Sequence, residues 1–234
     1  MTILGVRVDN ISRKEILEKI ESFLSEDRFH QIATVNPEFI LAAQKDKKFK
    51  NILNTTDLNI ADGVGIWYAF IRFGGWLKTR IAGVDLTQEI LRIADKKKLS
   101  VFLAITKNGF SSYKEVHGVL SKNYPNIKFS GESLDPLNFF SYNIRNTKYE
   151  ILFCNFGAPY QERFIQSVKN DTIRLAIGIG GSFDFITGKI KRAPKIMRIF
   201  GLEWLWRLIL EPKYRFRRII NAVIIFPIKV LFSR

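Results

Sequence analysis

Short apolar runs alternate with segments of helical periodicity along most of the chain. Apolar residues recur at helical spacing up to Leu24 after a capping box formed by Ser12 and Glu15, which predicts a helix beginning just after Ser12. Asn36 followed by Pro37 is typical of the N-cap and first position of a second helix. The same spacing predicts further helices over residues 87–98 and 160–170.

Five apolar runs, each bounded by polar residues or glycine, are typical of short buried strands. They lie at residues 31–35, 57–61, 100–105, 150–156 and 173–180. Because few polar positions fall inside these runs, we expect helices to cover both faces of the sheet. Strands that alternate with helices in this way predict an α/β fold with a Rossmann-like, mostly parallel sheet and helices on both faces.

The end of the chain has a different character, with bulky apolar, aromatic and basic residues interleaved. Its last apolar stretch, residues 219–232, is interrupted by Asn221, Pro227 and Lys229, and it is shorter than the ~20 residues that a membrane-spanning helix needs. This composition predicts a basic amphipathic helical appendage that lies on anionic lipid. The alternative is a helix that packs on the domain or on another subunit.

Charge is concentrated at the same end of the chain. The formal net charge is +15, and 12 of the Lys and Arg residues lie between Lys189 and Arg234, where Glu203 and Glu211 are the only acids. A basic end indicates an anionic partner, which could be nucleic acid, anionic lipid or a phosphorylated substrate. We therefore divide the chain into an α/β domain, residues 1–195, and a C-terminal appendage, residues 196–234.

Several classes of protein are disfavoured by what the sequence lacks. One cysteine and two histidines exclude an internal disulfide framework and disfavour a zinc site. No Asp-x-Asp pair occurs, which removes a common means of holding a metal on a nucleotide diphosphate, so we expect neither metal nor cofactor. The N-terminal residues "MTILGVRVDN" do not form the apolar core of a signal peptide, which favours a cytosolic location.

Polar residues follow the predicted strands where ligands bind in parallel sheets, beyond the carboxyl ends. Asp62 ends the run at 57–61 and precedes a Gly-Val-Gly turn that would let the backbone approach a ligand closely. It could be a turn or capping residue, or a base that removes a proton from an attacking hydroxyl. Thr34 and Asn36 could bind a sugar or a phosphate, although Asn36 could equally be a simple N-cap.

Two further groups could bind an anion. The turn that contains Gly180 and Gly181 could bring backbone N–H groups near a diphosphate, although it matches neither a dinucleotide fingerprint nor a P-loop. Arg80 could pair with a phosphate, and the alternative is a solvated or structural arginine. Each of these signals is weak when taken alone.

Six blocks together carry more information. "TVNPEFI", "IADGVGIW", "TRIAGVDL", "FGAPYQERF", "IGIGGSFDFITGKIKRAP" and "GLEWLWRLILEP" resemble the WecG/TagA/CpsF family of bacterial glycosyltransferases in order, spacing and content. The resemblance runs from about residue 3 to the end of the chain. It implies an inverting, metal-independent enzyme that moves a sugar from a UDP-sugar to a polyprenyl-diphosphate-linked acetamido sugar at the cytoplasmic face of the membrane.

The activity that the resemblance implies is transfer of N-acetylmannosamine from UDP-ManNAc to undecaprenyl-diphosphate-GlcNAc, which forms the linkage unit of wall teichoic acid. Relatives that use UDP-ManNAcA or another UDP-hexose for capsule, exopolysaccharide or common antigen are the alternative. The matching blocks imply Asp62 as the general base and Thr34 as a second catalytic residue. Substrate-binding roles are expected for Asn36, Arg80, Gln161, Gly180 and Gly181 within these blocks, and for Arg207, Arg215 and Arg218 of the basic C-terminal segment.

Partners follow from these expectations. The appendage is expected to dock on an anionic membrane surface and to place its arginines over the site entrance, so the enzyme would be peripheral on the inner face of the membrane. Nucleic acid is disfavoured as a partner because the long aliphatic runs of the appendage would make no favourable contact with a phosphate backbone. A non-catalytic scaffold for wall synthesis is a further alternative, and an exposed apolar tail would also allow a homo-oligomer.

Overall fold

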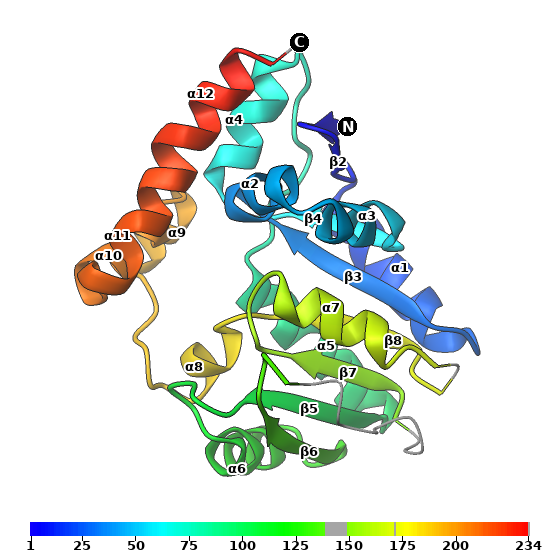
Figure 1. The fold of residues 1–234 in the computed structure, drawn as a ribbon. Coiled ribbons are helices and arrows are strands. Elements are labelled where there is room, and N and C mark those ends of the chain that lie inside the picture. Colours follow the sequence, from blue (N-terminus) through cyan, green and yellow to red (C-terminus); the bar gives the residue numbers. More distant parts are fainter. Residues whose placement is uncertain (139–148, 171, 234) are drawn as a thin grey trace.

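A sheet of parallel strands occupies the centre of the molecule, with strand order β4-β3-β8-β7-β5-β6 (Figure 1). The computed structural model describes residues 1–138, 149–170 and 172–233. The strands are β3 (His30–Val35), β4 (Leu58–Ala61), β5 (Ser100–Thr106), β6 (Lys128–Leu134), β7 (Ile151–Cys154) and β8 (Leu175–Gly178). The predicted α/β fold is confirmed, and all five predicted strands are present.

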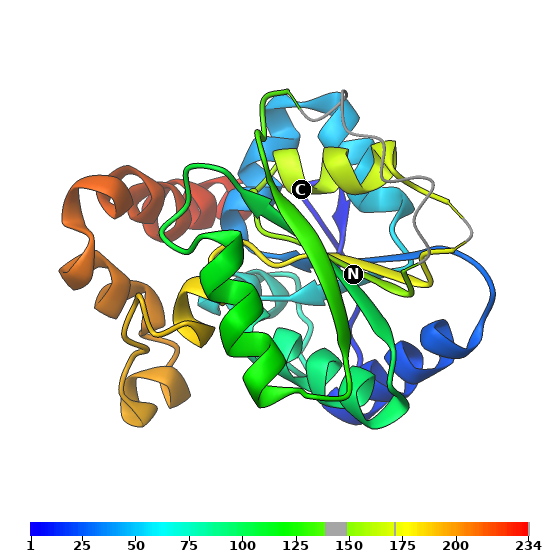
Figure 2. The same ribbon diagram turned by 90° about the horizontal axis from the view of Figure 1, so that it is seen from below.

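Helices cover both faces of this sheet, as Figure 2 shows. On one face lie α1 (Arg13–Ser25), α5 (Gly83–Lys97), α6 (Tyr113–Asn123) and the short α8 (Ser182–Ile186). On the other lie α2 (Pro37–Lys45), α3 (Lys47–Thr55) and α7 (Tyr160–Ser167), and α4 (Val64–Arg72) extends this side beyond the edge strand β4. Each strand supplies side chains alternately to the two layers, as Ile32 and Ala33 illustrate.

The predicted helix starts are confirmed by their capping contacts. The Ser12 side chain accepts from the Glu15 N–H while the Glu15 carboxylate accepts from the Ser12 N–H, so α1 begins with a capping box. Asn36 Oδ1 accepts from the Phe39 N–H at 3.1 Å, and Pro37 is the first residue of α2. These caps fix where the chain turns from β3 into α2.

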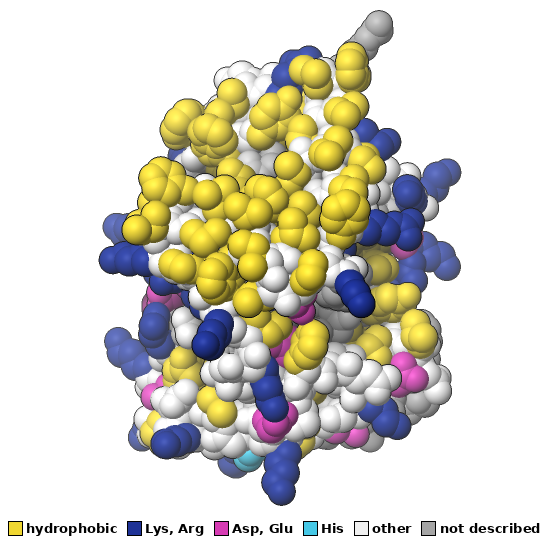
Figure 3. Space-filling view, turned by 90° about the vertical axis from the view of Figure 1, so that its left-hand side faces the viewer, with side chains coloured by type: hydrophobic (Ala, Val, Ile, Leu, Met, Phe, Trp, Pro, Cys, Tyr) yellow, Lys and Arg dark blue, Asp and Glu magenta, His cyan; other side chains and the backbone are white. Residues whose placement is uncertain are grey.

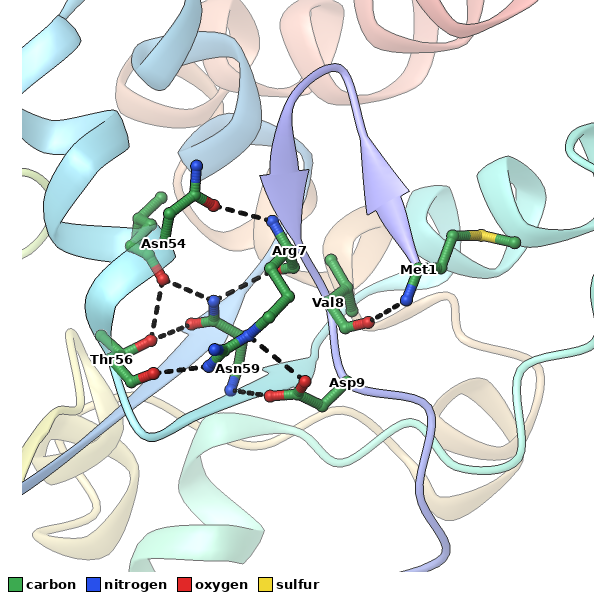
Figure 4. Close-up of polar contacts among 8 residues, drawn as sticks. Met1, Arg7, Val8, Asp9, Asn54, Thr56 and Asn59 are labelled. Carbon is green, nitrogen blue, oxygen red and sulfur yellow. Dashed lines mark hydrogen bonds and ion pairs between the residues drawn. The ribbon is translucent and has the colours of Figure 1, made fainter.

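A buried asparagine in β4 anchors the N-terminal segment to the sheet (Figure 4). Asn59 Nδ2 donates to the Arg7 carbonyl at 3.0 Å, and Asn59 Oδ1 accepts from the Thr56 hydroxyl at 2.8 Å. Its backbone N–H donates to an Asp9 carboxylate oxygen at 2.8 Å. The small hairpin formed by β1 (Thr2–Ile3) and β2 (Val6–Arg7) is thereby joined to the strand that leads to Asp62.

The C-terminal appendage lies beside the carboxyl ends of the strands (Figure 1). It contains α9 (Lys195–Ile199), α10 (Glu203–Leu210), α11 (Pro212–Ile220), a π-helical turn η3 (Asn221–Ile225) and α12 (Phe226–Leu231). Phe226 and Val230 are fully buried in the core that α2 and α4 form. One side of this terminal helix therefore packs on the α/β body. No helix in the described part of the chain is long and apolar enough to span a membrane.

Candidate active site

A crevice is expected where neighbouring loops leave the sheet toward opposite faces. β3 and β8 are neighbours, but the chain after β3 enters α2 on one face whereas the chain after β8 enters α8 on the other. Thr34, Asn36, Asp62 and the glycine turn at 180–181 all lie at this carboxyl edge. The residues that the sequence suggested as a rim are thus brought together.

Asp62 directly follows β4 at this edge. Its backbone N–H donates to the Val35 carbonyl at 2.8 Å, which continues the pairing of β4 with β3 by one residue. Burial raises the pKa of the Asp62 carboxyl to about 7, although the positive charge of Arg80 lowers it and the negative charge of Glu203 raises it further. A carboxyl group with this pKa can accept a proton near neutral pH.

The glycines after Asp62 have structural explanations. Gly63 has φ of 84°, a conformation that favours glycine, and its N–H bonds to the Asp62 carboxylate. A Cβ on Gly65 would lie 2.5 Å from a Pro37 carbon and 3.4 Å from Phe226. Close packing of α4 against α2 and α12 therefore accounts for Gly65, whereas the sequence suggested an approach to a ligand.

Thr34 and Asn36 lie on the neighbouring strand end. The Thr34 side chain is buried and faces Gly83, because a Cβ added to Gly83 would lie 3.7 Å from Thr34 Oγ1. The Ser182 side chain lies close to the same point. Asn36 uses Oδ1 to cap α2, so its Nδ2 group is the part that can donate to a ligand. Asn36 can therefore cap α2 and still contact a ligand, so both roles considered for it are compatible with this geometry.

Gln161 lies beneath the rim and joins two loops. Its Oε1 accepts from the N–H groups of Gly157 at 3.1 Å and Gly180 at 3.0 Å, and its Nε2 donates to Glu162 at 2.6 Å. Gln161 and Glu162 are both buried, and burial raises the pKa of Glu162 to about 7. The Gly180 N–H is engaged inside the protein, which corrects the expectation that both glycine amides face a ligand. Gly181 stays a candidate.

Arg207 of α10 lies next to this glycine turn. A Cβ on Gly181 would be 3.3 Å from Arg207 Nη2, and the guanidinium carbon lies 4.7 Å from the centre of the Phe185 ring. Burial lowers the pKa of Arg207 to about 10, so it stays charged at neutral pH. Its Nε and Nη2 have no hydrogen-bond partner within the part of the chain that the structure describes. A buried cation with N–H groups to donate is suited to binding an anion.

The other predicted arginines are held by partners inside the protein. Arg215 Nε donates to Glu211 at 3.0 Å, and Arg218 forms a two-point pair with Glu38 of α2 at 2.7 and 2.5 Å. Arg80 Nη2 donates to a carbonyl of α9 at 3.1 Å. Arg207 and Arg215 therefore meet at the appendage, whereas Arg80 and Arg218 tie the appendage to the body.

The sequence interpretation missed an ion cluster that joins three of the quoted blocks. Arg192 donates through both terminal nitrogens to Asp85, at 2.6 and 2.7 Å, and through Nε to Glu203 at 3.2 Å. A cavity of about 420 Å³ beside this cluster is also lined by Arg80 and Arg198. Asp85 lies 107 positions from Arg192 in the sequence, so only the fold reveals that these two residues pair.

Across residues 1–138, 149–170 and 172–233, no group of three or more His, Cys, Asp and Glu side chains lies together in a way that could hold a metal ion. The charged groups near the carboxyl edge of the sheet include Asp62, Arg80, Glu203 and Arg207.

The polar residues at the carboxyl edge of the sheet are typical of an α/β protein that binds a ligand there, and comparisons with known proteins identify the class of this protein as glycosyltransferase. The sequence matches the "Glycosyl transferase WecG/TagA/CpsF family" over residues 1–234, and the chain belongs to this family.

Two relatives illustrate the match. The chain is 36% identical over 194 residues to the N-acetylglucosaminyldiphosphoundecaprenol N-acetyl-beta-D-mannosaminyltransferase of Bacillus subtilis (strain 168), with 81% of this chain and 75% of that relative covered. It is 30% identical over 218 residues to the protein of the same name from Staphylococcus aureus (strain MRSA252), with 90% and 85% covered.

Proposed function

We propose that this chain transfers N-acetylmannosamine from UDP-ManNAc to undecaprenyl-diphosphate-linked GlcNAc, with inversion and with Asp62 as the general base. The observation that carries the proposal is the carboxyl group at the end of β4, which lies at the crevice and whose pKa burial raises to about 7. The printed names of both relatives describe the same sugar and the same acceptor.

Inversion requires a single displacement at the anomeric carbon of the donor sugar. The acceptor hydroxyl attacks this carbon while its proton passes to the Asp62 carboxylate, and UDP leaves from the opposite face. A base within hydrogen-bond reach of the hydroxyl contributes about 10²–10⁴-fold to the rate. Thr34 and Asn36, on the adjacent strand end, orient the acceptor or the donor sugar.

The departing UDP gains negative charge on its β-phosphate, which donors in the site must stabilise. Arg207 supports this role because its Nε and Nη2 are buried beside Gly181. Arg215 adds a second positive charge next to it. Arg80 and Arg218 complete the set by holding the appendage against the body, and Gln161 acts as a positioning residue through the glycine turn.

The outer face of the appendage supports docking on a membrane surface. Figure 3 shows a broad field of apolar side chains on this side of the molecule, with Lys and Arg side chains around its margin. Exposed residues of the appendage include Ile196, Ile199, Phe200, Ile209, Phe216, Ile224, Ile228 and Phe232, and Trp67, Ile71 and Trp76 of the body are exposed as well. In this proposal the enzyme binds the inner membrane face, where the lipid-linked acceptor lies.

The division into a catalytic domain, residues 1–195, and a membrane-associating appendage, residues 196–234, belongs to the same proposal. Self-association through the apolar field is expected when lipid is absent. The second candidate donor is UDP-ManNAcA or another UDP-hexose.

The test is transfer from a panel of UDP-sugars to a polyprenyl-diphosphate-GlcNAc acceptor in lipid, for the wild type and Asp62→Asn. The proposal predicts turnover with UDP-ManNAc that falls by about 10²–10⁴-fold in the variant. Turnover with a different UDP-sugar would leave the proposed mechanism standing, but it would show that the enzyme serves another biosynthetic pathway. If the Asp62→Asn variant were as fast as the wild type, Asp62 would not be the base, and its role would be that of a turn residue.

A further inference from the structure

Glu211 lies at the bend between α10 and α11, in the "ILEP" end of the last quoted block. Its backbone is not helical, with φ of −133° and ψ of 56°, because the following Pro212 disfavours a helical conformation at the preceding residue. The Glu211 side chain is nevertheless only 12% exposed. A carboxylate is thus turned inward at the point where the appendage bends.

This carboxylate lies between the two arginines that the proposed function assigns to the diphosphate. Glu211 Oε2 is 3.0 Å from Arg215 Nε and 3.8 Å from Arg207 Nη2. Glu211 Oε1 is buried and has no hydrogen-bond partner among the described residues. One negative charge therefore already offsets two positive ones in a region that is largely shielded from water.

The cluster also has a fixed position relative to the rim. Arg207 stacks over Phe185 and lies beside Gly181, and the negative charges of Glu211 and Asp184 both act on Arg207. A phosphate that approaches Gly181 would meet the same guanidinium that Glu211 faces. The phosphate and the Glu211 carboxylate would then compete for the same positive charge.

We propose that Glu211 sets the affinity of the diphosphate site by partly neutralising Arg207 and Arg215. This inference rests on the proposed function, because it takes a nucleoside diphosphate as the ligand of these arginines. The carboxylate weakens UDP binding and so speeds release of the product. Its acidic side chain is needed for that effect, since a neutral residue of the same shape would not offset the charge of either arginine.

The test is UDP binding to the full-length chain in phosphatidylglycerol-containing nanodiscs, measured by calorimetry for the wild type and Glu211→Gln. The variant keeps the side-chain shape and removes the charge, so we expect a Kd for UDP about tenfold lower than in the wild type. Its binding should also depend more steeply on salt. Uridine, which carries no phosphate, should bind both proteins equally.

Glu26→Gln is the matched control, because Glu26 also pairs with an arginine, at 2.7 Å from Arg28, but on the surface just before β3 and therefore at the opposite edge of the sheet from the rim. It should leave UDP binding unchanged. Glu211→Ser is a second neutral variant that should also tighten binding. A gain of affinity is diagnostic, because a variant that merely disturbs the fold would lose affinity.

Unchanged or weaker UDP binding in both Glu211 variants would overturn the inference while leaving the proposed function intact, provided that the wild type binds UDP. If the wild type binds no UDP at all, the proposed function fails and the inference fails with it.

Discussion

The rim of the α/β body and the C-terminal appendage contribute to the site by different physical means. On the rim, Asp62 and Gln161 are held by hydrogen bonds to backbone groups of neighbouring strands and loops. In the appendage, Arg207 and Arg215 are held by an ion pair with Glu211, on helices whose outer surface is apolar and exposed. The proposed base is therefore positioned by hydrogen bonds within the α/β body, whereas the arginines proposed to bind the diphosphate are positioned by ion pairs within the appendage.

Removing the appendage should have the largest effect. A chain that ends at residue 195 loses Arg207, Arg215 and Arg218 together with most of the apolar field, so we expect transfer to fall by about 10³-fold or more, as when several charge-stabilising groups are lost. The α/β body should keep its circular dichroism spectrum. It should also associate with itself, because the surface that Phe226 and Val230 cover would be exposed. Full turnover by the truncated chain would show that the appendage contributes nothing to catalysis.

Neutralising the cation beside the glycine turn should come next. Arg207→Gln removes a charge aimed at the departing UDP, so kcat should fall by about 10²-fold with a smaller change in the KM for acceptor. Arg217→Gln is the control, since Arg217 lies on the same appendage and is exposed. Steady-state kinetics in lipid provide the measurement. Equal losses in both variants would show that only the overall charge of the appendage matters.

Weakening the link between the regions should have a moderate effect. Arg192→Ala leaves the carboxylates of Asp85 and Glu203 without their shared cation, so the start of α10 is less firmly held. We expect kcat/KM to fall by about tenfold and the appendage to be cleaved faster by trypsin. Arg28→Ala, which removes a surface ion pair with Glu26, should change neither. If trypsin cleaved the appendage of the Arg192→Ala variant no faster than that of the wild type, Arg192 would not link the appendage to the body.

The smallest effect concerns stability and its dependence on pH. A carboxyl whose folded pKa of about 7 exceeds its unfolded pKa binds more protons when folded, so its contribution to stability is present at acid pH and is lost as the pH rises to about 7. Asp62→Asn avoids this loss. Its Tm should exceed that of the wild type by about 5 °C near pH 8, corresponding to about 2 kcal/mol, and by little near pH 4.

Glu18→Gln, on the exposed side of α1, serves as the control for that comparison and should show no such pH dependence. A Tm difference for Asp62→Asn that stays constant from about pH 4 to pH 8 would mean that the pKa of the carboxyl is not raised by burial.

The same contrast explains what could be predicted from the sequence. The strands that lead to Thr34 and Asp62 are short apolar runs between polar turns, and Asn36 with Pro37 marks the next helix, so local patterns were sufficient for the rim. The edge strand β6 was missed because its sequence, "KFSGESL", is largely polar and only partly buried. An edge strand needs no continuous apolar run, since one of its sides faces water.

The ion-pair partners of arginines in and next to the appendage could not be predicted in the same way. Arg218 and Glu38 are 180 positions apart, and Arg192 and Asp85 are 107 positions apart, so neither pair exists until the chain has folded. Gln161 shows the same limit on the rim. Its motif suggested a substrate contact, but only the fold shows that its side chain is buried against two glycine N–H groups.

The central claim is that Asp62 removes the proton from the acceptor hydroxyl. The most direct measurement is the pH dependence of kcat/KM for transfer to the lipid-linked acceptor, in the wild type and in Asp62→Asn. The wild-type rate should rise with pH through an apparent pKa of about 7, as the carboxylate forms, and then level off. The variant should lose both the rate and this inflection. A wild-type profile that Asp62→Asn reproduces would contradict the account, because another group would then be the base.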